Sequence, residues 1–241
     1  MAAQDNTRPL QTCELRAMFC EHGLLDKADG SSKFAQGDTQ VMAAAYGPVE
    51  VKLNKELIDR ATLEVIFRPK IGIPGCSEKL VEGIIRNSCE PIVLTALHPR
   101  ASLTIVVQVV QNSGSLLSCA VNAACLAMMD AGFPMRCMMC GITCAITEQD
   151  ELVLDPTLEQ ERKATAVLTF VFDSVNQNLL TSSTKGSFDV DQYNKCLAAS
   201  KAAMGNILAF YRQSVERKLS KDAKYTDMIT NAVSSEAETV S

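Results

Sequence analysis

Apolar and polar positions alternate along several short stretches of this chain, and this pattern predicts a protein rich in β-strands. Residues 32–34 and 39–46 are two such stretches, separated by a short polar turn at 36–38, so they predict a hairpin. Residues 61–67 alternate again and predict a strand that is covered on one face. The charged residues 49–60 between them predict an edge strand or an exposed connection.

A second pattern, with apolar positions three or four residues apart, predicts helices. Residues 78–97 have this spacing, although Pro91 lies in the middle and predicts a kink. Residues 188–218 repeat the pattern and predict a long last helix that packs against a sheet. After it the chain is polar without an apolar period, so we expect residues 220–241 to be a disordered tail and residues 1–9 a flexible N-terminus.

The centre of the chain, residues 103–132, joins a β-branched apolar run to a Gly/Ser turn and then to a long apolar helix. Ser113 or Ser115 is the expected N-cap, and Gly132 is expected to end the helix. Nearly all faces of this helix are apolar, so we expect it to lie between two layers. A strand that enters a helix through such a turn is a ready phosphate site, because the helix N-terminus presents free N–H groups.

Two further strand pairs are predicted after the central helix. Residues 135–146 and 151–154 form the first pair, and residues 164–172 and 177–184 form a hairpin. Strands therefore outnumber helices, and long helices interrupt them at intervals. This order predicts an α+β fold (α/β layered) in which helices pack on mixed sheets, with residues 10–219 forming one domain.

Composition and charge narrow the class of protein. Of the 241 residues, 47% are hydrophobic and 21% are charged, which are ordinary globular values. A net charge of −5 argues against a free-standing nucleic-acid binder with a broad basic face, but allows a small basic patch on a subunit of an assembly. We find no signal-peptide core and no membrane-spanning run, so we expect the ten cysteines to be reduced, in cytosol or nucleus.

Cys137, Cys140 and Cys144 form a C-x-x-C-x-x-x-C pattern that needs weighing. A structural zinc site normally takes four Cys or His ligands, and both histidines, His22 and His98, lie far away in the sequence. The residues between the cysteines are those of an apolar strand. We therefore expect a buried strand with no metal and no cofactor, and keep a Cys-based metal or redox module as an alternative.

Three blocks in this order resemble the ribonuclease PH family of phosphate-dependent 3′-to-5′ RNA-trimming enzymes: residues 36–41 (QGDTQV), 112–131 and 152–156 (LVLDP). The resemblance covers roughly residues 10–217, and LEVIFRPKIGIPG is similar to ring subunits of the eukaryotic exosome. It implies a ribonuclease PH-like domain with a ribosomal protein S5 domain 2-like fold. It also implies a distribution over nucleus, nucleolus and cytoplasm, and as partners other ribonuclease PH-like ring subunits, S1/KH-type cap subunits, RNA and associated hydrolytic exoribonucleases.

The resemblance also implies where the chemistry of the family would stand. An active member has a phosphate-gripping arginine where this chain has Leu117, which cannot bind a dianion. Asp155 stands in the position of one catalytic acid, and Glu159 is a longer substitute for the second. We treat these three as vestigial and predict a non-catalytic subunit of the exosome ring. The alternative is an active phosphate-dependent 3′-to-5′ exoribonuclease.

Active members also hold RNA with arginines on the helix before the central strand. Here Glu90 stands where an arginine is expected, and Arg86 remains, shifted by one position. Arg68 and Lys70, on a Gly/Pro-rich loop, are the best candidates for RNA contacts, and Lys79 can join them. Because open sheet edges seek partners, we also expect the isolated chain to form a self-dimer or to bind a related subunit.

Overall fold

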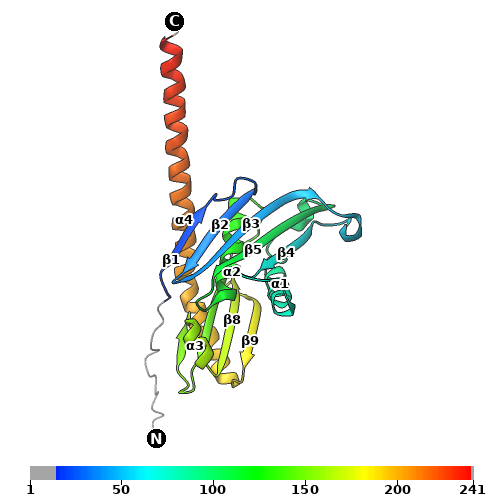
Figure 1. Cartoon of the computed structure of the whole chain (residues 1–241), viewed down its shortest axis with the longest axis vertical. Coiled ribbons are helices and arrows are strands. Elements are labelled where there is room, and N and C mark those ends of the chain that lie inside the picture. The colour runs from blue at the N-terminus through cyan, green and yellow to red at the C-terminus, as the bar shows by residue number, and fades with distance from the viewer. Residues whose placement is uncertain (1–14, 240–241) are drawn as a thin grey trace.

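The computed structural model describes residues 15–239, with the backbone alone at residue 222 and residues 225–239. Two sheets enclose one helix, and a long helix runs along both sheets and on beyond them (Figure 1). In chain order the elements are β1 (Met18–His22), β2 (Gly30–Gln36), β3 (Thr39–Glu50), η1 (Leu53–Lys55), β4 (Thr62–Arg68), α1 (Cys76–Cys89), η2 (Thr95–Leu97), β5 (Ala101–Gln111), α2 (Leu116–Asp130), β6 (Met139–Ile146), β7 (Leu152–Leu154), α3 (Leu158–Lys163), β8 (Ala166–Asp173), β9 (Leu179–Gly186) and α4 (Val190–Thr239).

The first sheet has the strand order β1-β2-β3-β5-β4. Its neighbouring strands are antiparallel except β4 and β5, which are parallel and are connected through α1. The predicted hairpin is confirmed, since β2 and β3 pair with Gln36 opposite Thr39. The strand predicted over residues 61–67 is β4, whose residues are alternately buried and partly exposed. Residues 51–60 form an exposed connection after β3.

The second sheet has the order β7-β6-β8-β9, and all its pairs are antiparallel. Both strand pairs predicted for this half of the chain are therefore confirmed. All eight residues of β6 are buried, whereas β9 lies at the edge and is mostly exposed. No helix among the described residues is both long and apolar enough to cross a membrane.

Helix α2 lies between the two sheets, as its apolar composition predicts. Every residue from Ser118 to Met128 is buried, and α2 packs on β2 and β3 on one side and on β6 on the other. Gly141 of β6 lies so close that a Cβ there would be 3.2 Å from the backbone of Ser118. Small side chains on both elements therefore allow the sheet and the helix to approach closely.

The predicted helix over residues 78–97 needs correction, because α1 begins at Cys76 and ends at Cys89 instead of continuing through a kink. Pro91 has no N–H to donate, and its ring would collide with the carbonyl four residues earlier. The helix stops before this residue, and the chain continues through a turn and the short helix η2.

Part of the predicted disordered tail over residues 220–241 also needs correction, because α4 continues to Thr239; residues 240–241 lie outside the described residues. Residues 220–239 contain neither Gly nor Pro, so no residue there interrupts a helix that has already begun. The absence of an apolar period in residues 220–239 indicates that this segment does not pack against the sheets. It does not indicate whether the segment is helical. The flexible N-terminus predicted over residues 1–9 lies outside the described residues.

Candidate functional site

The turn between β5 and α2 is the part of the fold that can receive an anion. Gly114 has φ +104°, and a Cβ there would lie 2.5 Å from the carbonyl oxygen of Pro156, so only glycine fits. Ser115 follows in the left-handed conformation, with φ 53°, as the N-cap of α2. Its Oγ donates to the Pro156 carbonyl at 3.0 Å, so this hydroxyl binds the acidic loop and does not cap the helix.

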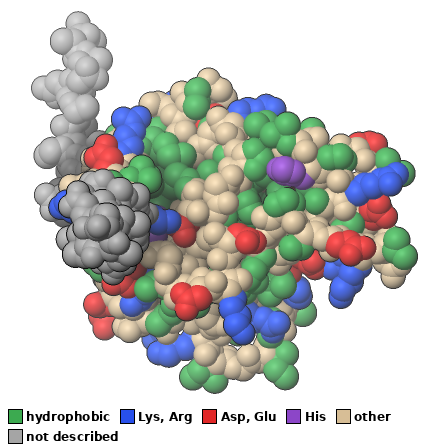
Figure 2. All heavy atoms as spheres, turned by 90° about the horizontal axis from the view of Figure 1, so that it is seen from above, with side chains coloured by type: hydrophobic (Ala, Val, Ile, Leu, Met, Phe, Trp, Pro, Cys, Tyr) green, Lys and Arg blue, Asp and Glu red, His purple; other side chains and the backbone are tan. Residues whose placement is uncertain are grey.

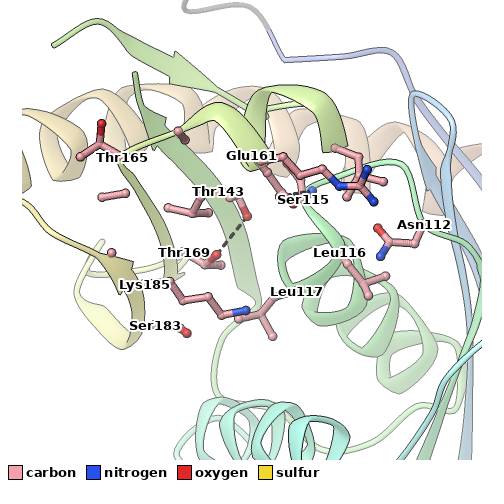
Figure 3. A pocket seen from close by; sticks show the side chains of 16 residues that line it. Asn112, Ser115, Leu116, Leu117, Thr143, Glu161, Thr165, Thr169, Ser183 and Lys185 are labelled. Atoms are coloured by element: carbon pink, nitrogen blue, oxygen red, sulfur yellow. Dashed lines mark hydrogen bonds between the residues drawn. The ribbon is translucent and has the colours of Figure 1, made fainter. Parts of the chain in front are cut away.

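A carboxylate of the chain itself occupies the anion position at this helix N-terminus. The backbone N–H of Ser115 donates to Oε1 of Glu161 at 2.7 Å. Glu161 lies in α3, the short helix that follows the acidic strand end, and Figure 3 shows its side chain reaching the turn. Glu159, the predicted second acid, is exposed instead. The structure therefore brings Glu161, and not Glu159, to the start of α2, where the sequence predicts a phosphate site.

Asp155, the predicted first acid, is buried and paired with Arg16. The guanidinium of Arg16 donates to both carboxylate oxygens, with Nε–Oδ2 2.8 Å and Nη2–Oδ1 2.6 Å, and the Arg16 backbone N–H donates to Oδ2 at 3.1 Å. Nη2 also reaches the carbonyl of Gly114 at 3.4 Å. Burial lowers the pKa of Arg16, but hydrogen bonding to Asp155 and its charge outweigh burial and raise that pKa overall. Asp155 thus anchors the start of the described chain to the turn.

Leu117 lines a cavity of about 440 Å³ beside the turn, together with Leu116 and residues of α3, β8 and β9. Two cations line this cavity, Arg162 and Lys185. Figure 3 shows Lys185 extending from β9 toward Leu117. On the cavity wall the hydroxyls of Thr143 and Thr169 lie 3.1 Å apart and hydrogen-bond to each other, so they are already satisfied. The cavity lining thus combines apolar side chains, including Leu116 and Leu117, with hydroxyl groups and two cations.

The four predicted RNA contacts do not converge on this cavity. Arg68 ends β4 and Lys70 lies on the loop after it, and both side chains are exposed. Lys79 and Arg86 lie on α1 and line a separate hollow of about 470 Å³. Lys79 forms an ion pair with Glu82, Nζ–Oε1 2.9 Å, whereas Arg86 forms none among the described residues. Arg68 and Lys70 therefore do not line the hollow that Lys79 and Arg86 share.

The three clustered cysteines lie in the second sheet or directly before it. Cys140 and Cys144 belong to β6 and are buried, as the strand interpretation predicts. Burial raises the pKa of Cys137 to about 11 and that of Cys140 further still, so neither thiol readily becomes a thiolate ligand. Among the residues whose side chains the structure describes (15–221, 223 and 224), no three His, Cys, Asp or Glu residues are grouped so that they could hold a metal ion.

Three residues of the site escaped the sequence analysis. Arg16 is separated from Asp155 by 139 positions, so no local pattern relates the two. Lys185 lies on an exposed edge strand and looks like an ordinary surface cation. Glu161 follows Asp155 by six residues in an acidic segment, and the capping pattern of Thr157 and Gln160 was the available signal that a helical turn carries it inward.

Fold and site together define a class of protein. Two sheets enclose a buried helix, and the N-terminus of this helix faces an acidic loop, as expected of a phosphate site. Residues 14–134 match the family model described as 3′ exoribonuclease family, domain 1, and residues 137–203 match domain 2 of the same family. The chain belongs to the 3′ exoribonuclease family, that is, to the ribonuclease PH family. The two matched segments correspond to the two sheets.

Full-length relatives carry related names. The chain is 36% identical over 225 residues to the Arabidopsis thaliana protein named exosome complex exonuclease RRP46 homolog, covering 86% of this chain and 94% of that one. It is 32% identical over 213 residues to exosome complex component RRP46 of Saccharomyces cerevisiae, covering 83% and 96%. The crystal structure of rice (Oryza sativa) Rrp46 matches with a TM-score of 0.81 and 34% identity, over 87% of this chain and 98% of that one. An archaeal exosome core chain, at 19% identity and TM-score 0.72, shares the fold.

Proposed function

We propose that this chain is a non-catalytic, structural subunit of an RNA exosome ring. In this role it helps to form the channel through which RNA passes for 3′-to-5′ processing and decay, including ribosomal-RNA maturation and messenger-RNA turnover. The names of its full-length relatives support the assembly, and the family fold supplies two sheets with open edges for ring contacts. Related ring subunits, S1/KH-type caps and hydrolytic exoribonucleases are the partners, in nucleus, nucleolus and cytoplasm.

One observation supports the absence of phosphorolytic activity above all others. The carboxylate of Glu161 accepts the hydrogen bond that a phosphate would need from the backbone N–H of Ser115. An incoming phosphate must displace this acid and then lie beside Leu117, where the family has an arginine. A charge-assisted hydrogen bond is worth about 1.5–3 kcal/mol. The loss of one preorganised donor at an active site costs on the order of 10²–10³ in rate. Glu161 and Leu117 together therefore make phosphorolysis ineffective.

RNA contact is a separate part of the proposal and rests on Arg68 and Lys70. Both are exposed, Arg68 at the end of β4 and Lys70 on the loop after it, which suits contacts to a phosphate backbone that passes the chain. The face in Figure 2 shows Lys and Arg interspersed with Asp and Glu, so this face carries local cations and no broad basic surface.

The test is phosphorolysis by the assembled ring. The full chain is combined with its ring neighbours, supplied with single-stranded RNA and inorganic phosphate, and the release of nucleoside diphosphates is measured. We expect none above a no-enzyme control, both from the chain alone and from the ring. Release that is abolished by Asp155→Asn or Lys185→Ala would establish the alternative, an active phosphate-dependent exoribonuclease.

The RNA contact has its own test, a prediction on binding. Arg68→Glu combined with Lys70→Glu should weaken RNA binding by the assembled ring several-fold and lower its salt dependence, because two phosphate contacts are lost. Arg212→Glu, a charge reversal at an exposed position of α4, is the matched control. Equal effects of both changes in a filter-binding titration would argue against a specific role for the loop.

A further inference from the structure

The hollow beside α1 lies along the free edge of a strand. Four consecutive residues of β4, Thr62 to Val65, all line it, although successive side chains of a strand point to opposite faces. A hollow reached by all four must border the backbone edge of β4. The opposite wall is one face of α1, because its lining positions are three and four residues apart: Lys79, Glu82, Gly83 and Arg86. We call this hollow the β4 groove.

The edge that borders the β4 groove is open. β4 is the last strand of its sheet, and within the described chain it pairs with β5 alone. Its outward N–H and C=O groups therefore have no strand partner among the described residues. An edge of seven residues in an extended conformation is a template on which another extended segment can add as a further strand.

Gly83 leaves room for a second chain to approach here. It lies in the interior of α1, where glycine destabilises a helix relative to alanine. A Cβ at this position would meet nothing within 4 Å, and its backbone is not in the left-handed region. The packing and the backbone of this chain thus provide no reason for glycine. A partner backbone that passes close to α1 would provide one.

The charges in the β4 groove indicate what kind of chain fits. Lys55 pairs with Glu64, and Lys79 pairs with Glu82, so four of its five charged side chains compensate one another. Arg86 is exposed and has no ion-pair partner among the described residues. One uncompensated cation suits a single carboxylate. A nucleic-acid backbone would bring several negative charges close to Glu64 and Glu82, which disfavours RNA.

We propose that the β4 groove binds an extended, acidic segment of a partner protein, which adds to β4 as a strand and places a carboxylate opposite Arg86. Backbone hydrogen bonds to β4 supply affinity, and Arg86 supplies the preference for acid. This interaction needs neither the cavity at α2 nor the loop of Arg68 and Lys70. It therefore stands or falls separately from the proposed role in a ring.

Two fluorescent synthetic heptapeptides of alternating valine and threonine test the proposal on the full chain, one with a central aspartate and one with a central lysine. We expect saturable binding of the aspartate peptide, and binding of the lysine peptide that is about tenfold weaker. Arg86→Glu should reverse this preference. Hydrogen exchange should show the bound peptide protecting amides of β4, while amides of the β9 edge exchange as before. Absence of binding, indifference to Arg86→Glu, or protection at β9 instead of β4 would overturn the proposal.

A matched pair of glycine variants tests the close approach. Gly205 of α4 resembles Gly83, because it lies in a helix and a Cβ there would also meet nothing within 4 Å. Both Gly83→Ala and Gly205→Ala should raise the thermal midpoint of the free chain. Only Gly83→Ala should weaken binding of the aspartate peptide, by about tenfold, through collision with the peptide backbone. Equal affinity of the two variants would contradict the close approach.

A competition experiment separates a protein partner from RNA. An oligouridylate that competes with the peptide and loses its binding in Arg86→Glu would assign the groove to RNA and overturn the proposal.

Discussion

At the scale of single residues, two carboxylates support the turn before α2: Asp155, which the sequence predicts to be a vestigial acid, and Glu161, which the sequence analysis missed. Asp155 is held on both oxygens by Arg16, and Glu161 accepts the backbone N–H at the start of α2. A buried carboxylate in a bidentate pair with an arginine has its lone pairs engaged and is poorly placed to donate a proton or to bind a metal. Both carboxylates are thus engaged in supporting the turn.

The pair of Arg16 and Asp155 carries the first stability prediction. Arg16→Met should lower the free energy of unfolding by about 3 kcal/mol, because the carboxylate of Asp155, whose side chain is 1% exposed, would be left without its cation. Urea unfolding followed by circular dichroism measures the change. Arg60→Met is the control, because Arg60 pairs with Glu90 at the surface, with Nη1 3.8 Å from Oε1 and both side chains about half exposed. Its effect on the free energy of unfolding should stay within about 0.5 kcal/mol. Similar losses for both variants would contradict the structural role of Arg16.

His22 provides a prediction on pH. Its Nε2 lies 2.9 Å from Oγ of Ser214 and 3.4 Å from Sγ of Cys20, and its Nδ1 lies 3.5 Å from Oδ1 of Asp130, which also accepts from Lys218. Burial lowers the pKa of His22, Asp130 opposes this and Lys218 adds to it, with a net lowering. A histidine with a lowered folded pKa binds its proton more readily in the unfolded chain. Stability due to neutral His22 is therefore present above the unfolded value of about 6.5 and is lost as the pH falls below it.

The measurement compares urea unfolding at about pH 7.5 and about pH 5.5 for the wild type and for His22→Gln. The wild type should lose more stability between the two values than the variant does, because the variant has no group to protonate at this position. His98→Gln, which alters the other histidine of the chain, should behave as the wild type. An equal loss for the wild type and His22→Gln would contradict this account.

At the scale of elements, the buried Asn122 joins α2, β6 and α4. Its side chain accepts from the N–H of Gly141 at 2.7 Å, donates to the Gly141 carbonyl at 3.1 Å, and accepts from the hydroxyl of Tyr211 at 2.8 Å. Both side chains are fully buried, and burial raises the pKa of Tyr211 well above its ordinary value. Buried polar groups are costly unless they are hydrogen-bonded, so this small network fixes how the long helix sits on the body.

Two substitutions should separate the parts of this network. Tyr211→Phe removes one hydrogen bond without leaving a cavity and should cost about 1 kcal/mol of unfolding free energy. Asn122→Ala leaves both backbone groups of Gly141 and the Tyr211 hydroxyl unpaired, and should cost about 3 kcal/mol or more. Thermal unfolding under identical conditions ranks the two. A Tyr211→Phe variant that is less stable than Asn122→Ala would contradict the network.

The sequence predicts elements well where their residues share a local pattern. Alternation located the β2–β3 hairpin and β4, and uniform apolarity correctly placed α2 between layers. The end of α1 was missed because apolar spacing continues past Pro91, although backbone chemistry does not allow the helix to do so. The pairing of Arg16 with Asp155 was missed because it depends on how distant segments pack. Local patterns define elements, and packing decides which charged groups meet.

At the scale of the whole molecule, the chain retains the architecture of its family while the anion position of that architecture is occupied by its own acid. Both sheets, the buried helix between them and the turn at Gly114 are in place. Lys185 and Arg162 line the cavity beside this turn together with Ser115, Leu116 and Leu117 at the start of α2. This architecture suits the proposed role as a structural subunit of a ring.

The most direct measurement of this account is phosphate binding at the Ser115 amide. The full chain, labelled with ¹⁵N, is titrated with inorganic phosphate, and the resonance of the Ser115 N–H is followed. Because Glu161 already accepts this hydrogen bond, the account predicts no saturable shift up to about 10 mM phosphate, a weak-binding concentration. A saturable shift of the Ser115 resonance at lower concentrations would show that the site still takes its anion, and would contradict the account.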